Sequence, residues 1–348
     1  METEPIGSIP RPPELVAAMT GGAGADRLDQ LFDLALRDTL RRFEATGSPV
    51  VTDGEQTKSS FVTYPLDGLA TIGPGGAVIP FADGHTRQLP QLTGGPFRYA
   101  HHADEFLRRA VGLTDRPVKQ AVIAVSALSL LYPQDGLADY PQEQFLGDLV
   151  AEGVADIRGC LDAGAHKVQI DFTEGRLALK LDPSGGLLRQ FVALNNQVLD
   201  HFDDDERSRI GIHTCPGGDQ DSTHSADVDY VELLPELFRL RAGNFYLQLA
   251  SETDRPRVLR TVAEHLPAAA TVFVGVIDPI DPRVETPEEV CARVLEAAEH
   301  LPVDRLGTCD DCGFSPFGDD LSTSRDLAFE KIRARVEGTR LAEERLGD

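Results

Sequence analysis

The chain has 348 residues, of which 41% are hydrophobic, and its formal net charge at pH 7 is −24. A surface this acidic repels nucleic acids and anionic lipid headgroups, so we expect neither a nucleic acid nor a membrane as a partner. No apolar run is long enough to cross a bilayer, and the acidic N-terminus lacks the basic and then apolar order of a signal peptide, which together predict a cytoplasmic location.

Eight short apolar runs with little polar alternation are predicted as strands. In chain order they are residues 5–8, 50–53, 121–126, 167–171, 210–213, 244–250, 271–276 and 305–308. Helical patterns with apolar residues three to four apart lie at 28–43, 144–161, 187–202, 228–240, 256–265 and 287–300, and a charged helix at about 324–346 closes the chain. Repetition of strand and helix predicts an α/β protein with a (β/α)8 TIM barrel.

Residues 54–116 interrupt this rhythm. The stretch is rich in glycine and proline and includes Gly73-Pro74-Gly75-Gly76. We interpret it as an insertion after the second strand that holds a small hairpin. No internal repeat or low-complexity linker divides the chain, so residues 1–348 are predicted to form a single barrel domain.

Polar residues at the carboxyl ends of barrel strands are the expected functional residues. His213 and Cys215 are two positions apart just after the fifth predicted strand, and side chains at this spacing point to the same side of an extended segment. Cys312 follows the last predicted strand. Imidazole and thiolate ligands suit Zn²⁺, so we predict that these three residues bind one zinc ion. The alternative is that they are buried thiols and an ordinary core histidine.

Five motifs occur in a defined order along residues 6–314. They are Ile6-Gly7-Ser8 with Pro10-Arg11-Pro12, Asp53-Gly54-Glu55 with Ser60-Phe61, Gln169-Ile170-Asp171, His213-Thr214-Cys215, and Asp311-Cys312-Gly313-Phe314. Together they resemble the motifs of the catalytic barrel of cobalamin-independent methionine synthase and its single-barrel relatives, which include epoxyalkane:coenzyme M transferase.

The resemblance implies a zinc-dependent methyl or alkyl transferase. Zinc would hold the thiol of a small, amino-acid-like substrate as a thiolate, which attacks an electrophilic carbon. Gly7 and Ser8 would contact the carboxylate of that substrate, and the catalytic acids Glu55 and Asp171 would hold its amino group. The alternative is that both acids are ordinary carboxylates in salt bridges at the mouth of the barrel.

The fourth zinc ligand is the first departure from the family pattern. The resemblance implies a glutamate at the end of the sixth strand, but counting along that strand places Gln248 there, and Glu252 follows four residues later. A carboxylate is the better zinc ligand, which favours Glu252, whereas the register favours Gln248. Both remain candidates.

Other departures concern the alkyl donor. The family stacks the donor's pterin on a tryptophan after the third strand, but this chain has no tryptophan. Residues 278–283 lack the family's proton-donating histidine, and Asp171 is followed by Phe172-Thr173-Glu174 rather than Glu-Pro-Ala. Transfer from a folate amine requires a proton on the nitrogen, so we expect another donor: a corrinoid, an epoxide or another activated carbon. A zinc-dependent lyase or rearrangement, or a non-catalytic binding protein, are the alternative functions.

Overall fold

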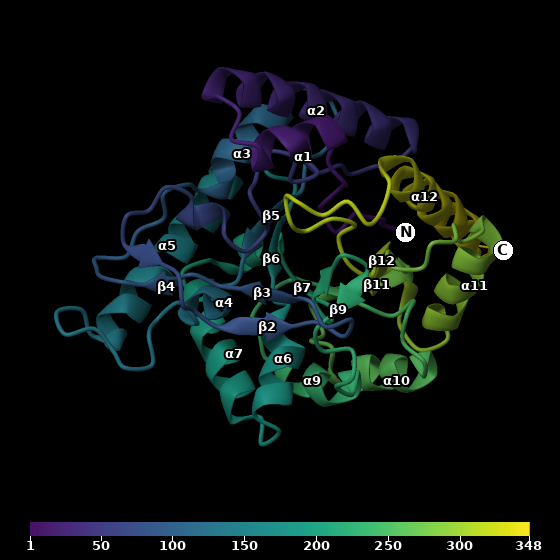
Figure 1. Ribbon diagram of the computed structural model, residues 1–348. Helices are drawn as coiled ribbons and strands as arrows, with labels where there is room; N and C mark the ends of the chain where they lie inside the picture. The colour runs from purple at the N-terminus through teal and green to yellow at the C-terminus, as the bar shows by residue number, and fades with distance from the viewer. Residues whose placement is uncertain (348) are drawn as a thin grey trace.

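A parallel six-stranded sheet forms the centre of the computed structural model, which describes residues 1–347. The strand order is β12-β11-β10-β7-β6-β5. The strands are β5 (Gln120–Ile123), β6 (Val168–Asp171), β7 (Ile210–Thr214), β10 (Asn244–Leu247), β11 (Thr271–Ile277) and β12 (Leu306–Asp310). Nearly all of their residues are buried, as expected for parallel strands that helices cover. Figure 1 shows the strands in the middle of the molecule with the helices around them.

Two predicted strands lie at the edges of this sheet as extended segments rather than regular strands. Thr3 makes a single parallel bridge to Thr308 of β12, and Val51 makes one to Val118 just before β5. The first segment contains Pro5, which has no N–H group to donate to a sheet ladder. The prediction of strands at 5–8 and 50–53 is therefore wrong in detail, although the segments run where barrel strands would.

The two edge segments also contact each other. The Thr52 hydroxyl donates to the Gly7 carbonyl at 2.8 Å, and the Ile9 N–H donates to the Gly54 carbonyl at 3.0 Å. These contacts bring the beginning of the chain beside the segment that follows α2. The predicted α/β barrel-type fold is confirmed, with regular pairing in six of its eight predicted strands.

Two strands are shorter than predicted. The third was expected to reach residue 126, but it ends at Ile123 and a short helix begins at Val125. The sixth was expected to reach residue 250, but it ends at Leu247. The Gln248 N–H still donates to the Thr214 carbonyl, whereas the N–H groups of Leu249 and Ala250 donate to the carboxylate of Asp311 instead of to a strand.

Helices occupy all seven predicted positions with small changes in their ends. They are α2 (Ala25–Ala45), α5 (Gln142–Asp162), α7 (Gly186–Leu199), α9 (Tyr230–Leu237), α10 (Arg255–His265), α11 (Pro287–Ala298) and α12 (Arg325–Gly347). A capping box between Thr286 and Glu289 fixes the start of α11. Shorter helices were not predicted: α1 (Pro13–Thr20), α3 (Ala103–Val111), α4 (Val125–Ser129), α6 (Glu174–Leu181), α8 (Asp204–Arg207), η1 (Tyr64–Leu66) and η2 (Val303–Arg305). None of the described helices is long and apolar enough to span a membrane.

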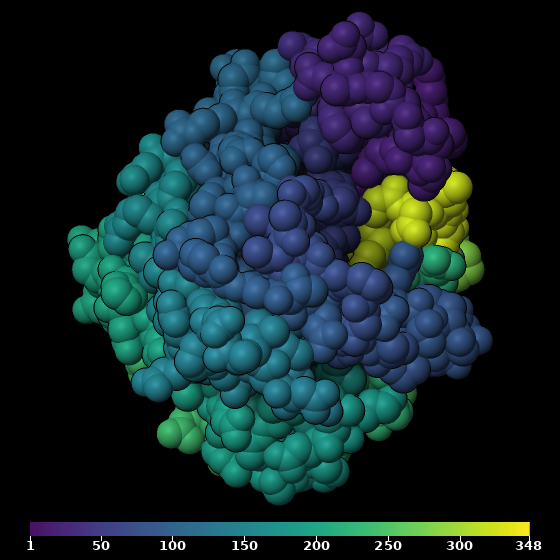
Figure 2. Space-filling view, turned by 60° about the vertical axis from the view of Figure 1, so that its left-hand side comes forward, coloured from purple at the N-terminus to yellow at the C-terminus, as the bar shows by residue number. Residues whose placement is uncertain are grey.

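The segment 54–116, predicted as an insertion, forms a helix and two short antiparallel strand pairs. Its last part forms α3, whose Ala103 N–H donates to Asp156 of α5, so α3 is a helix of the barrel layer. The earlier part forms two antiparallel pairs, β1 (Ile72–Gly73) with β4 (Gln91–Leu92) and β2 (Val78–Pro80) with β3 (Thr86–Gln88). Figure 1 shows β2 and β3 in front of the central strands, and in Figure 2 the blue atoms of this region cover much of the face in view.

Candidate metal centre and substrate site

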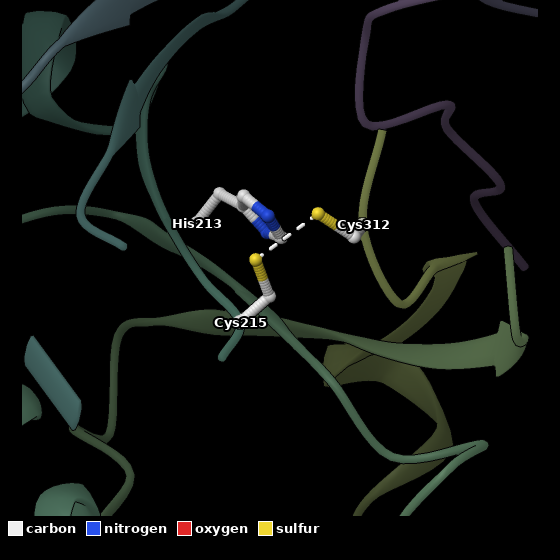
Figure 3. Close-up of side chains that lie close together, drawn as sticks. All are labelled: His213, Cys215 and Cys312. Carbon is white, nitrogen blue, oxygen red and sulfur yellow. Dashed lines mark hydrogen bonds between the residues drawn. The ribbon is translucent and has the colours of Figure 1, made fainter. Parts of the chain in front are cut away.

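His213, Cys215 and Cys312 lie together at the carboxyl ends of two strands. His213 lies in β7, one residue before the strand ends, and Cys215 directly follows the strand. Cys312 lies two residues after the end of β12. The Sγ atoms of the two cysteines are 3.1 Å apart, and one ligand atom from each of the three residues lies within 4.8 Å of the others. Figure 3 shows the imidazole beside the line that joins the two sulfurs. The structure therefore brings the three predicted metal ligands into one cluster.

The imidazole of His213 has no hydrogen-bond partner. The residue is only 2% exposed, and neither Nδ1 nor Nε2 is paired. An unpaired buried polar group costs about 1–3 kcal/mol, a cost that a metal ligand bond would remove. The neighbouring Cys215 sulfur, together with burial, holds the pKa of the Cys312 thiol well above its ordinary value. An imidazole and two thiols so arranged fit a divalent cation that prefers nitrogen and sulfur.

Arg176 of α6 contacts both candidates for the fourth ligand. Its Nη1 donates to Gln248 Oε1 at 3.0 Å and to Glu252 Oε1 at 2.8 Å. The guanidinium is 2% exposed, and it also donates to the Val228 carbonyl. Within the described residues, the cluster of close metal-ligand atoms does not include Glu252. Arg176 was not predicted as a site residue, because α6 was not predicted.

The predicted substrate residues meet at one small cavity of about 20 Å³. Its lining includes Gly7, Ser8, Glu55, Asp171, His213 and Cys312. A space of this size holds roughly one water molecule. Five separate parts of the sequence thus contribute these residues to the cavity, and a substrate must widen the cavity or enter from a neighbouring one.

Glu55 lines this cavity and is also paired with a buried cation. Lys58 Nζ lies 3.2 Å from Glu55 Oε1 and donates to the Ala121 carbonyl at 2.9 Å, with the ring of Tyr64 4.5 Å away. Burial nevertheless raises the pKa of Glu55 to about 7. A salt bridge at Glu55 was one of the two expectations, but its partner Lys58 was not identified. The position of Lys58 three residues later was the available signal.

Asp171 ends β6 beside His213 on β7, with which it is paired in the parallel register. Gln169 Nε2 donates to Asp171 Oδ1 at 2.7 Å, and Lys119 Nζ donates to Gln169 Oε1 at 2.8 Å. Burial raises the pKa of Asp171, and the electrostatic interaction with His213 partly offsets this rise. The hydrogen bonds from Lys119 through Gln169 therefore orient this carboxylate beside His213.

Asp311 connects the loop of Cys312 to the end of β10. Its carboxylate accepts the N–H groups of Leu249, Ala250 and Ser251, each at 2.8 Å, and the Ser251 hydroxyl at 2.7 Å. Several charge-assisted hydrogen bonds to one carboxylate are strong and directional. These hydrogen bonds therefore hold Asp311, which directly precedes Cys312, against the loop that carries Gln248.

Two larger cavities adjoin the cluster. One, of about 390 Å³, shares Phe61, Thr173 and Gly218 with the small cavity and is lined mainly by apolar side chains. Ala127 lines it in the region where the family pattern has its stacking tryptophan. The other, of about 230 Å³, is lined by residues of the loops that follow β7, β10, β11 and β12, including Gln248, Glu252 and Cys312.

The hairpin β2/β3 is tied to the loops on both sides of the cluster. Arg87 of β3 donates to Asp219 at 3.0 Å and to Asp319 at 2.9 Å. The Ala82 N–H donates to the Thr223 carbonyl at 2.9 Å. Asp219 lies in a second small hairpin, β8 (Gly218–Asp219) with β9 (Ser222–Thr223), directly after Cys215. The β2/β3 hairpin is therefore bound to the loops that carry the cysteines.

Comparison with known proteins assigns the family. Residues 2–325 match the family described as "Cobalamin-independent synthase, Catalytic domain". The chain belongs to this family. It is 23% identical over 352 residues to the methionine synthase of Sulfurisphaera tokodaii, with 99% of this chain and 94% of that protein covered. It is 27% identical over 327 residues to the 5-methyltetrahydropteroyltriglutamate–homocysteine methyltransferase of Acidiphilium cryptum, of which it spans only 39%, with 89% of this chain covered.

Solved structures agree on the fold. A B12-independent methionine synthase from Shewanella sp. W3-18-1, in complex with selenomethionine, superposes with a TM-score of 0.78 at 19% identity, with 99% of this chain and 98% of that chain covered. A protein from Listeria monocytogenes described as a putative vitamin-B12-independent methionine synthase gives 0.73 at 21% identity, with coverage of 99% and 97%. The predicted resemblance to the cobalamin-independent synthases is therefore confirmed.

Proposed function

We propose that this member of the cobalamin-independent synthase family is a zinc-dependent transferase that moves a methyl or alkyl group to or from a thiol. The observation that carries the proposal is the cluster of His213, Cys215 and Cys312, in which the buried imidazole has no other partner. Zinc bound there would supply the positive charge that keeps a ligating substrate thiol deprotonated at neutral pH.

The three protein ligands leave one position for the substrate. Catalytic zinc sites characteristically have three protein ligands and an open fourth position. Arg176 occupies Gln248 and Glu252 with hydrogen bonds of 3.0 and 2.8 Å, which supports leaving that position to the substrate sulfur.

A small amino-acid-like thiol suits the residues of the small cavity. Asp171 presents a carboxylate to an ammonium group, and Gly7 and Ser8 lie across the same cavity. Homocysteine is the test substrate, because it appears in the name of the related Acidiphilium cryptum enzyme. Lys58 already pairs with Glu55, so Asp171 is the stronger of the two candidates for binding the ammonium.

The donor would bind in the cavity of about 390 Å³, which shares three lining residues with the small cavity. Its apolar lining suits a bulky or weakly polar donor. Without the tryptophan and the histidine of the family pattern, we favour a donor other than a standard methyl-folate, such as a corrinoid or an epoxide.

The experiment is to load the purified protein with Zn²⁺ and to assay transfer to homocysteine. The donors are methylcobalamin, propylene oxide and 5-methyltetrahydropteroyltriglutamate. We expect about one zinc per chain and transfer from at least one donor, both lost in His213→Ala. Absence of bound zinc together with unchanged activity in Cys312→Ser would overturn the proposal. A product formed by cleavage or rearrangement without transfer would indicate a lyase on the same residues.

A further inference from the structure

The cavity of about 390 Å³, called the larger cavity below, has four ionisable side chains among its described lining residues: Arg87, Glu174, His224 and Asp319. Arg87 and Asp319 form an ion pair at 2.9 Å, so both are charged and neither is a ready proton donor at neutral pH. Burial lowers the pKa of His224 to about 4, which leaves a neutral imidazole. Burial raises the pKa of Glu174 to about 8, so this side chain is mainly a carboxylic acid at neutral pH.

Hydrogen bonds identify the oxygen of Glu174 that carries the proton. Asn195 Nδ2 donates to Ser126 Oγ at 2.6 Å, and the Ser126 hydroxyl in turn donates to Glu174 Oε1. Because Oε1 accepts this hydrogen, the acidic proton belongs on Oε2. Oε2 is buried and has no hydrogen-bond partner, although Glu174 as a whole is only 4% exposed. An unpaired buried O–H group indicates that a partner is missing.

The position of Glu174 connects this proton to the reacting thiol. Thr173, the preceding residue, lines both the larger cavity and the small cavity that contains His213 and Cys312. Asp171, three residues earlier, lines the small cavity only. Glu174 therefore lies on the donor side of the boundary between the two cavities.

We propose that Glu174 is the general acid of the transfer reaction and protonates the leaving atom of a donor bound in the larger cavity. The inference rests on the proposed function. The acceptor sulfur forms a bond to the transferred carbon while the bond between that carbon and a nitrogen or oxygen breaks. The leaving atom takes the electron pair of that bond and the proton of Glu174. Solvent returns a proton to Glu174, which balances the proton that the thiol released.

Groups on β6, α4 and α7 set the protonation of Glu174. Asp171 at the end of β6 raises the pKa of Glu174. The Ser126 hydroxyl and the Ala127 N–H of α4 lower it, and Asn195 of α7 acts through Ser126. On α6 itself the nearest charged residue is Arg176, which is tied to Gln248 and Glu252.

The test compares donors that need a proton with one that does not. Wild-type protein and Glu174→Gln are loaded with zinc and assayed for alkyl transfer to homocysteine. With 5-methyltetrahydropteroyltriglutamate and propylene oxide, the C–N or C–O bond breaks and the nitrogen or oxygen must gain a proton. Methyl iodide releases iodide, which needs no proton. We expect the transfer rate of Glu174→Gln to fall about 100-fold or more with the two donors that need a proton. With methyl iodide its rate should stay within about twofold of wild type.

Two further variants separate acid catalysis from structural damage. Glu174→Asp keeps an acid and is expected to recover part of the lost rate, and Glu264→Gln, an exposed glutamate on α10, is expected to behave as wild type. Equal rates for Glu174→Gln and wild type, or equal losses with every donor, would overturn the proposal. So would a wild-type enzyme that uses methyl iodide alone. If methyl iodide also fails and no zinc is bound, the proposed function itself fails.

Discussion

The Sγ atoms of Cys215 and Cys312 lie 3.1 Å apart, although 97 positions separate the two residues in the chain. Each cysteine follows a different parallel strand, and the carboxyl ends of such strands meet at one end of a barrel. Cys215 directly follows β7, and Cys312 lies two residues after β12, so both thiols are anchored close to the sheet. The pair is therefore held in place by the sheet, with the imidazole of His213 beside it.

Removing either sulfur should abolish tight zinc binding. We expect Cys312→Ser and Cys215→Ser to weaken zinc binding by at least about 100-fold, because a hydroxyl is a much poorer ligand than a thiolate. Competition with a chromophoric chelator measures the affinity. Cys291→Ala on α11 is the control, since that cysteine is buried away from the cluster. Equal zinc affinity in Cys312→Ser and in Cys291→Ala would show that the cluster does not bind the metal.

Lys58 should be essential for the stability of the buried site. Replacement by methionine leaves the Glu55 carboxylate buried without its cation, and breaking such a pair costs about 3–5 kcal/mol of the free energy of unfolding. Urea denaturation measures this change. The double variant Glu55→Gln/Lys58→Met should recover part of the loss. Lys180→Met, which breaks an exposed pair with Asp227, should cost under about 1 kcal/mol. A loss in Lys58→Met no larger than in Lys180→Met would refute the prediction.

Glu174 should make the protein less stable as the pH rises. In the folded protein its pKa is raised from 4.5 to about 8, so the folded chain keeps a proton that the unfolded chain releases across this range. Stability from this group is fully present below pH 4.5 and is lost as the pH approaches 8. Between pH 5 and pH 8, the free energy of unfolding of wild type should fall by on the order of 3 kcal/mol more than that of Glu174→Gln.

Urea denaturation at several pH values, on metal-free protein, checks this expectation. Glu264→Gln should retain the wild-type pH dependence, because that side chain is exposed on α10. Identical pH dependence in wild type and Glu174→Gln would mean that Glu174 has an ordinary pKa in the folded protein.

Arg87 should hold the β2/β3 hairpin over the site. Arg87→Ala removes its hydrogen bonds to Asp219 and Asp319, and charged hydrogen bonds of this kind contribute about 2 kcal/mol. We expect faster amide hydrogen exchange in residues 78–88 and 218–223, measured by mass spectrometry, and a higher KM for homocysteine. Arg41→Ala removes an exposed pair on α2 and should leave both unchanged. Unaltered exchange at 78–88 in Arg87→Ala would argue against this role.

The sequence was sufficient to predict that His213, Cys215 and Cys312 lie together, and it predicted most of the barrel. His213 and Cys215 share a side of one extended segment, and Cys312 follows another strand, so spacing and topology alone bring them together. The helices with a clear apolar stripe were also predictable. The edge segments at 5–8 and 50–53 were not, because their single bridges depend on tertiary contacts rather than on apolar pattern.

The partners of the site residues could not be predicted in the same way. Lys58, Arg176 and Arg87 are charged residues that look like surface residues in the sequence, and only the fold shows that they pair with Glu55, Glu252 and Asp219. The elevated pKa of Glu174 likewise depends on burial beneath α4 and on the hydroxyl of Ser126. Long-range contacts of this kind leave no periodic signal in the chain.

X-ray absorption at the zinc edge, with and without homocysteine, tests the central claim most directly. Without the thiol, the zinc-loaded protein should show two sulfur ligands, from Cys215 and Cys312, and one imidazole from His213. Addition of homocysteine should raise the number of sulfur ligands to three, because the substrate sulfur fills the open position. A sulfur count that stays at two under saturating homocysteine would contradict thiol activation at this site.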